Sequence, residues 1–317
     1  MNKRERVLQV LSGKAADCTP VSFWFHFSGE NTKGQACVDA HLAYYRRCGL
    51  DYIKIMSDGI DYHLPAGFEP KTAADWKKLK PQGRGSSYIE DAVWRCKRLN
   101  EELQGECCTF YNIFAPFSLM RQVAGDETVM QQLREDPESV LEGLEAIATD
   151  CATLCRAVVE EGGCTGIYLS LQGGELGRFT YDEYRSMIMP SDLMALNAAK
   201  AAGGQNICHL CGWAGDRNDL NLWKDYPADA FNWAIFIDLL SIQDAKTFFG
   251  GKPLIGGFDN RKTSLIYNGT KEEIQAFAKK LVEENKGYPY IVGADCTVPN
   301  TIDLDHLTWA VEAVHGA

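Results

Sequence analysis

The stretch DPESVLEGLEAIATDCATLCRAVVEEGGCTGIYLSLQ, residues 136–172, decides the fold of this chain. Residues 136–163 carry apolar side chains at helical spacing and end in two glycines, which is typical of an amphipathic helix. The run TGIYLSLQ that follows (165–172) is short, apolar and rich in β-forming residues, as buried strands are. A long helix followed at once by a buried strand indicates one unit of an alternating α/β fold.

The same alternation extends along almost the whole chain. Eight units of this kind are typical of a (β/α)8 barrel, and no Gly-x-Gly-x-x-Gly turn after the first strand supports a doubly wound sheet. We therefore predict an α/β protein in which residues 19–317 form a single (β/α)8 TIM barrel. Residues 1–18 are predicted to form an N-terminal helical extension outside the barrel. The predicted strands are residues 19–27, 51–58, 107–114, 165–172, 205–212, 230–236, 252–259 and 288–296.

The composition excludes several classes of protein. The chain has 317 residues, of which 45% are hydrophobic and 24% charged, and its formal net charge is −11. This acidic balance disfavours nucleic acid as a partner, and no apolar run approaches the roughly 20 residues of a membrane span. The 12 cysteines are scattered, and the charged N-terminus lacks the apolar core of a signal peptide. We therefore expect a cytoplasmic protein with reduced cysteines and no membrane association.

Three potential metal ligands lie at the ends of predicted strands. His209 and Cys211 are two residues apart on one strand and therefore share a face, and Cys296 ends the last predicted strand. Because the strand ends of a barrel meet at one mouth, we expect these three side chains to converge. One imidazole and two thiolates suit tetrahedral zinc with an open fourth position. The alternative is that both cysteines are core residues and His209 is a hydrogen-bonded interior histidine. Cys208 points to the other face and is predicted to pack in the core.

Several acidic residues and one further histidine also lie at strand ends. We predict catalytic roles for Asp58 and Glu175, and substrate-binding roles for His26, Asp58 and Asp259. The alternatives for the carboxylates are that one of them is a fourth zinc ligand, or that they cap loops or lie on the surface. For His26, the alternative is a place within an aromatic first strand.

These motifs resemble those of the uroporphyrinogen decarboxylase superfamily over nearly the full length of the chain. Within it, the chain is more similar to the corrinoid-linked methyltransferases of the methylcobamide:coenzyme M type than to the decarboxylases. The methyltransferases hold zinc with a His-x-Cys pair and a distant Cys, which His209, Cys211 and Cys296 match. The motifs that carry the resemblance are MSDGI (56–60), NIFAPFSLMRQ (112–122), CHLCG (208–212), FNWAIFID (231–238), FGGKPLIGGFDN (249–260) and YIVGADCTVPNTI (290–302).

The chain departs from the decarboxylases at two positions. Their first loop is rich in arginine, whereas HFSGENTKG (26–34) contains none, and Cys296 stands where they have a histidine. Asn232 stands where many relatives have an aspartate before the tryptophan. The resemblance therefore disfavours porphyrinogen decarboxylation.

The resemblance implies a zinc-dependent methyltransferase. It would move a methyl group between a corrinoid (cobalamin) and a small thiol or a methylated substrate, such as a methoxyaromatic compound. No Asp-x-His-x-x-Gly motif is present, so the corrinoid is expected on a separate partner protein. The alternatives are a decarboxylase-like or other barrel enzyme that uses no corrinoid, and a catalytically silent binding barrel.

Overall fold

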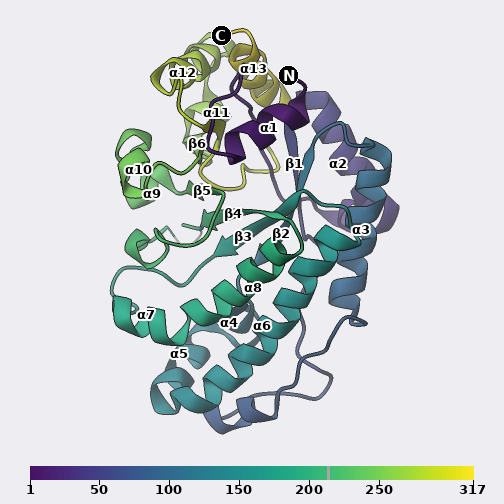
Figure 1. Cartoon of the computed structure of the whole chain (residues 1–317), viewed down its shortest axis with the longest axis vertical. Coiled ribbons are helices and arrows are strands. Elements are labelled where there is room, and N and C mark those ends of the chain that lie inside the picture. The colour runs from purple at the N-terminus through teal and green to yellow at the C-terminus, as the bar shows by residue number, and fades with distance from the viewer. Residues whose placement is uncertain (213–214) are drawn as a thin grey trace.

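The chain forms a curled sheet of seven parallel strands surrounded by helices (Figure 1). The computed structural model describes residues 1–212 and 215–317. Each strand pairs with the next one along the chain, and every pair is parallel. The predicted α/β barrel class is confirmed. The strands are β1 (Tyr52–Ile55), β2 (Cys108–Phe114), β3 (Gly166–Leu171), β4 (Gln205–Leu210), β5 (Ala230–Trp233), β6 (Leu254–Phe258) and β7 (Tyr290–Ala294).

An irregular segment around Val21 connects β7 to β1. Val21 forms an isolated parallel bridge with Val292 of β7, and Ser22 donates its backbone N–H to Val292 O at 3.0 Å. On the other side, the backbone N–H of Asp51 donates to Val21 O at 2.9 Å. This segment therefore occupies the place of an eighth strand between the first and last strands of the sheet.

The prediction of a regular strand over residues 19–27 is wrong, because side chains take the backbone donors that a strand would use. The backbone N–H of Val21 donates to Asp51 Oδ2 at 2.7 Å, and that of Phe27 donates to Asp58 Oδ2 at 2.7 Å. Pro20 has no N–H at all. The aromatic, β-forming composition of this segment is therefore not matched by a ladder of backbone hydrogen bonds.

Helix α1 (Lys3–Leu11) covers the N-terminal end of the barrel. Val7, Val10 and Leu11 pack against side chains that point into the barrel. The helix ends at Leu11, seven residues before the predicted limit of the extension at residue 18. The division of the chain into an extension and a barrel domain at residue 18 stays a prediction.

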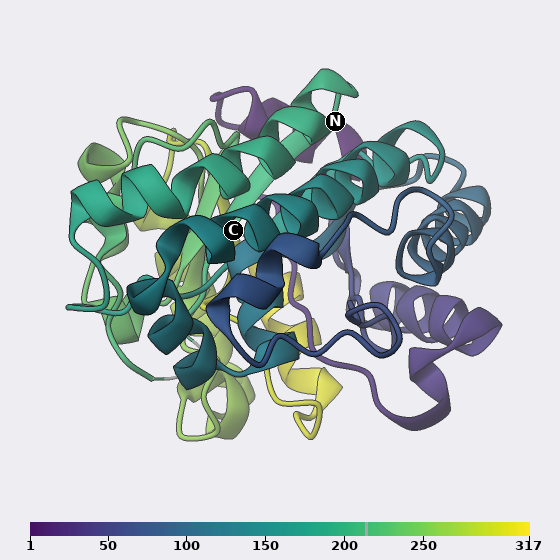
Figure 2. The same ribbon diagram turned by 90° about the horizontal axis from the view of Figure 1, so that it is seen from below.

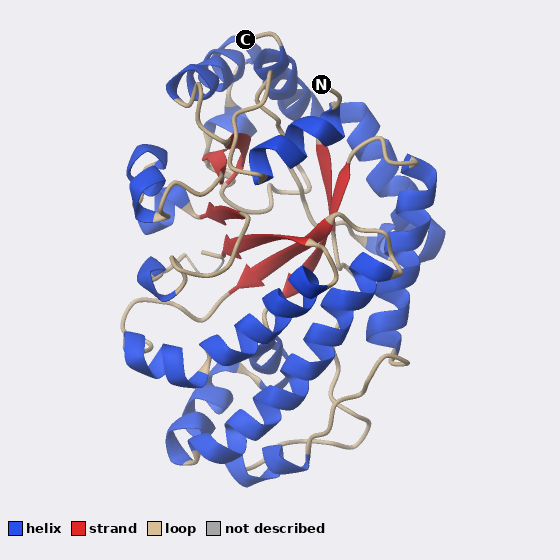
Figure 3. Ribbon diagram, viewed as in Figure 1, coloured by secondary structure: helices blue, strands red, loops and turns tan. Residues whose placement is uncertain are grey.

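Helices form the outer layer of the barrel, and the long helices α6 (Pro137–Glu160) and α8 (Met189–Ala201) run side by side (Figures 2 and 3). Helices α7 (Tyr181–Met187) and α8 meet at Ile188. In the described part of the chain, no helix is long and apolar enough to cross a bilayer. The remaining α-helices of the described chain are α2 (Gly34–Cys48), α3 (Ser87–Leu103), α4 (Pro116–Ala124), α5 (Asp126–Glu135), α9 (Ile235–Asp238), α10 (Ile242–Phe248), α11 (Leu265–Asn268), α12 (Lys271–Glu284) and α13 (Leu304–His315).

The inward-facing side chains change from apolar to polar along β1 to β5. Near the strand starts they form an apolar cluster inside the barrel, and two residues further on, at the next inward-facing position, they are buried and polar. The closed apolar end therefore supports a polar end that faces the barrel mouth. The apolar members are Tyr52, Phe110, Tyr168, Ile207 and Ala230, and the polar members are Lys54, Asn112, Ser170, His209 and Asn232.

A buried carboxyl group links α7, α8 and the segment that precedes β5. Asp192 Oδ2 accepts hydrogen bonds from Tyr184 at 2.9 Å and from Tyr226 at 2.8 Å. Its other oxygen is buried without a partner among the described residues. Burial raises the pKa of Asp192 to about 7, because the low-dielectric interior disfavours the charged carboxylate.

This carboxyl group predicts a pH dependence of stability. The unfolded chain loses the Asp192 proton near pH 3.8, whereas the folded protein keeps it up to about pH 7. The stabilising contribution is therefore complete below pH 3.8 and is lost as the pH rises to about 7. We expect the free energy of unfolding of the wild type, minus that of Asp192→Asn, to fall by on the order of 3–4 kcal/mol over this range. Urea unfolding at a series of pH values measures this difference, and a difference that does not change with pH contradicts the assignment.

Candidate metal site

Strand β4 directs His209 and the following Cys211 into the barrel. His209 pairs with Ser170 of β3 and Asn232 of β5, and Cys211 lies just beyond the strand end. Cys208 is fully buried and belongs to the outer core between the strands and the helices, which confirms its predicted packing role. The alternation of side chains along a strand therefore separates the site residues from their neighbour.

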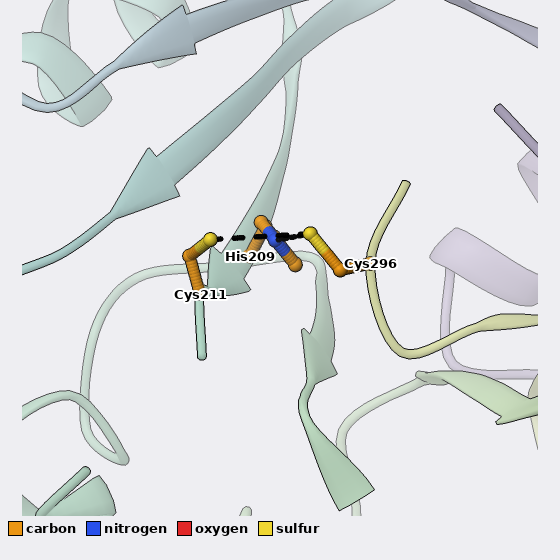
Figure 4. A group of neighbouring side chains, drawn as sticks. All are labelled: His209, Cys211 and Cys296. Atoms are coloured by element: carbon orange, nitrogen blue, oxygen red, sulfur yellow. Dashed lines mark hydrogen bonds between the residues drawn. The ribbon is translucent and has the colours of Figure 1, made fainter. Parts of the chain in front are cut away.

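The three predicted ligands converge from two segments of the chain (Figure 4). Cys296 follows β7, and its Sγ lies 3.3 Å from His209 Nε2 and 3.9 Å from Cys211 Sγ. All three ligand atoms lie within 4.8 Å of one another. Tetrahedral zinc with ordinary bond lengths separates two sulfurs by about 3.8 Å, and a sulfur and a nitrogen by about 3.6 Å. The arrangement therefore fits zinc, with a fourth position left for another ligand.

The side chain of Asn232 fixes the orientation and tautomer of His209. Its Nδ2 donates to the backbone oxygens of Ile255 at 3.0 Å and Ala294 at 3.1 Å, so its Oδ1 must face the histidine. His209 Nδ1 lies 2.6 Å from this oxygen and therefore carries the ring proton. The lone pair of Nε2 is left for a metal ion, which is the arrangement that histidine ligands usually adopt.

The electrostatic environment favours a thiolate at Cys296. The hydrogen bond with Cys211, with further contributions from His209 and Lys54, holds the pKa of Cys296 well below its usual value. Burial lowers the pKa of Lys54 to about 8, and the nearby cysteines and Asp58 oppose this fall. Because thiolates and not thiols bind metals, this environment prepares Cys296 for coordination.

A cavity of about 290 Å³ borders all three ligands. Its walls come from β1 to β4 and from the segment after β7, and they combine polar groups with Met56 and Phe114. A wider cavity of about 730 Å³, between residues 61–71 and the end of α4, shares Gln122 with it. The polar residues that line the smaller cavity are His26, Lys54, Asn112, Gln122, Ser170, Gln172, His209, Cys211, Cys296 and Thr297.

His26 and Asp58 form a pair at the edge of this cavity. His26 lines the cavity, and its Nδ1 lies 2.6 Å from Asp58 Oδ1. Asp58 itself does not line the cavity, and its second oxygen accepts the backbone N–H of Phe27. Asp58 therefore holds His26 and its loop in place, while its predicted catalytic and substrate contacts stay predictions.

Glu175 and Asp259 lie away from the metal ligands, and neither lines their cavity. Glu175 forms ion pairs with Arg178 at 2.6 Å and Arg121 at 3.6 Å. Asp259 accepts a hydrogen bond from Arg261 Nε at 2.9 Å. Asp259 also accepts the backbone N–H of Arg261 and so matches the loop-cap alternative, whereas Glu175 is largely buried and ion-paired. The predicted roles of both residues in catalysis and substrate binding stay predictions.

Sequence reasoning missed four polar residues of the barrel interior, Lys54, Asn112, Ser170 and Asn232. Each lies at an inward-facing position two residues beyond an apolar one on the same strand. A polar residue within an otherwise apolar strand was the available signal. Asn232 was noticed only as a departure from relatives, and its bond to His209 could not be read from the chain.

Removal of either cysteine ligand is predicted to abolish tight zinc binding. We expect about one zinc per wild-type chain by elemental analysis, and loss of the metal in Cys211→Ala and Cys296→Ala. Cys208→Ala is the matched control, because it removes a neighbouring thiol that faces away from the site. Equal zinc content in all four proteins contradicts the ligand set.

Asn232 is predicted to support zinc affinity without touching the metal. Asn232→Leu keeps the approximate volume but removes the acceptor for His209 Nδ1, so we expect zinc affinity to fall by about 10–100-fold. Asn232→Asp keeps an acceptor and should lie between the wild type and the leucine variant. Competition with a chromogenic chelator measures the three affinities. Unchanged affinity in Asn232→Leu would show that this hydrogen bond does not position the ligand.

Solved structures similar to this chain include three with low sequence identity. A methyltransferase from Methanosarcina mazei has a TM-score of 0.75 and 14% identity, and the match covers 99% of this chain and 98% of that one. A B12-independent methionine synthase from Shewanella sp. W3-18-1 has a TM-score of 0.57 and 13% identity, with 96% and 94% covered. A putative vitamin-B12-independent methionine synthase from Listeria monocytogenes has a TM-score of 0.53 and 14% identity, with 88% and 85% covered. At these identities the likeness shows the fold alone.

The sequence comparison is more specific. Comparison with curated proteins finds no match. The sequence model of the uroporphyrinogen decarboxylase (URO-D) family matches residues 2–317, which is nearly the entire chain. The curled sheet of parallel strands paired in chain order agrees with this match. The chain belongs to the uroporphyrinogen decarboxylase family.

Proposed function

We propose that this chain is a zinc-dependent methyltransferase that works with a corrinoid carried by a separate protein. The methyl group would move between the corrinoid and a small thiol or a methylated substrate. The observation that carries the proposal is the convergence of His209, Cys211 and Cys296 on one wall of a cavity. Three ligands beside a cavity suit catalysis, because structural zinc sites normally have four protein ligands.

The donor set suits thiol chemistry. Zinc held by two thiolates and an imidazole would lower the pKa of a thiol in its open position and supply a thiolate at neutral pH. The chain's own contribution is to hold this donor set in place. Asn232 keeps the proton on His209 Nδ1 and therefore keeps Nε2 directed at the site. The cavity of about 290 Å³ is of the size that a small substrate needs.

The surroundings of the site also support access by a partner. The wider cavity of about 730 Å³ shares the lining residue Gln122 with the metal-site cavity and lies between the loop after β1 and the end of α4. Loops after the strands form the mouth of a barrel, where a carrier protein would present its corrinoid. The fold similarity to a methyltransferase agrees with this proposal.

The cavity does not favour porphyrinogen decarboxylation. A porphyrinogen with several carboxylates requires several cationic groups, and Lys54 is the single lysine or arginine among the described residues that line the metal-site cavity. The volume of about 290 Å³ is also small for a tetrapyrrole. A catalytically silent barrel remains the alternative if the protein shows no turnover.

The proposal predicts zinc-dependent methyl transfer. Zinc-loaded protein is incubated with methylcobalamin and a panel of small thiols, and loss of the methylcobalamin absorbance and formation of the methyl thioether are followed. The reverse arm offers reduced cobalamin and methoxylated aromatics. We expect transfer in at least one arm and its loss, by about 100-fold or more, in Cys296→Ala, because a catalytic metal contributes several kcal/mol.

Cys208→Ala serves as the control with unchanged transfer. Release of CO2 from a porphyrinogen without any corrinoid contradicts the proposal and supports a decarboxylase. Absence of every activity, with zinc bound and with the carrier protein of the same organism supplied, supports the silent barrel.

A further inference from the structure

Lys54 is a buried cation inside the cavity that borders the metal ligands. It lies on β1, at the inward-facing position between Tyr52 and Met56, and only 5% of it is exposed. Buried lysines normally have an anionic partner, because removal of an ammonium group from water is costly. The surroundings of Lys54 therefore need an explanation.

The Lys54 ammonium group has no hydrogen-bond acceptor or carboxylate partner among the described residues. Its Nζ lies over aromatic rings instead, 4.1 Å from the centre of Tyr168 and 4.9 Å from that of Trp24. Asp58 interacts with it electrostatically, but the two Asp58 oxygens already bind His26 and the Phe27 backbone. Ring faces compensate only part of the lost hydration.

Asn112, Ser170 and His209, which also line the cavity, already have hydrogen-bond partners within the protein. Ser170 Oγ donates to Asn112 Oδ1 at 3.0 Å, and Asn112 Nδ2 donates to Ser57 Oγ at 3.1 Å. His209 is held by Asn232. Lys54 is therefore the cation in this part of the cavity whose N–H donors remain for a ligand.

Charge balance favours the same conclusion. If Cys211 and Cys296 bind zinc as thiolates, the divalent ion cancels their two negative charges. The remaining anionic group that acts on Lys54 is then Asp58, whose two oxygens are already bonded to His26 and to the Phe27 backbone. A ligand that brings a negative group into the cavity would restore the balance in a region of low dielectric constant, where such an interaction is strong.

We propose that Lys54 is a substrate-binding residue that takes an oxyanion of the substrate, such as a carboxylate. The reacting sulfur or methyl group of the same molecule would lie at His209, Cys211 and Cys296. This inference rests on the proposed function for the place of the reacting group, but the anion site itself does not require methyl transfer. The substrate class is accordingly a small organic anion.

Two matched pairs of probes test the proposal. Propionate and 1-propanol are compared by ligand-observed NMR, and 3-mercaptopropionate and 3-mercapto-1-propanol are compared by calorimetry on the zinc-loaded protein. We expect the wild type to bind each anion at least about tenfold more tightly than its neutral analogue, because hydrogen bonds to charged groups are strong. Lys54→Met should remove this preference and leave the affinity for the neutral thiol unchanged.

Lys54→Arg should retain the preference, and Lys252→Met is the control. Lys252 is also partly buried, but it donates to the backbone oxygen of Ala228 and lies outside the cavity. Lys54→Gln replaces the methionine variant if that variant does not fold, as judged by circular dichroism and zinc content. Loss of the charge should not remove the zinc, because Lys54 is not a ligand.

The outcomes separate this proposal from the proposed function. If the wild type binds both thiols equally, or fails to bind propionate, the anion site is overturned and the zinc chemistry stands. If neither thiol binds but propionate binds in a Lys54-dependent way, the anion site stands and the thiol chemistry fails. If Lys54→Met weakens both thiols equally, Lys54 acts on the metal-bound sulfur and not on a distant anion, and the proposal is overturned.

Discussion

The carboxamide of Asn232 ties four consecutive strands together inside the barrel. From β5 it accepts a hydrogen bond from His209 on β4, and it donates to the backbone oxygens of Ile255 on β6 and Ala294 on β7. Cys296 follows Ala294 by two residues, so the same amide that orients the histidine also holds the segment that brings the distant cysteine. The Asn232 side chain makes three hydrogen bonds. It therefore sets the geometry of a site in which His209 and Cys296 are 87 residues apart in the sequence.

The barrel supports this site by a division along its axis. Helix α1 and the apolar cluster near the strand starts close one end, so the buried polar groups at the other end lie on a packed and rigid base. These polar groups differ in the partners that they have within the protein. Asn112 and Ser170 bind each other, and His209 binds Asn232, whereas Lys54 rests on aromatic rings. The apolar base and the polar site therefore occupy successive inward-facing positions of the same strands.

The regular parts of the fold and the ligand set follow from short-range patterns in the chain. Seven of the eight predicted strands are present, because alternation of helix and strand is a local property. The convergence of His209, Cys211 and Cys296 was predictable because all three lie at strand ends, which meet at one barrel mouth. The irregular course of residues 19–27 was not predictable from local pattern. The carboxylates that accept hydrogen bonds from its backbone, Asp51 and Asp58, come from elsewhere in the sequence. Ion pairs such as that of Glu175 with Arg178, and the isolation of Lys54, depend on three-dimensional contacts that no local pattern encodes.

The most direct test of the account is X-ray absorption at the zinc edge of the reconstituted protein, before and after addition of a small thiol. The account predicts two sulfur ligands at about 2.3 Å and one imidazole nitrogen at about 2.0 Å in the resting protein, with a light atom in the fourth position. Addition of the thiol should raise the sulfur count from two to three. A shell without sulfur would contradict the metal site at His209, Cys211 and Cys296, and a count that stays at two would contradict thiol activation at that site.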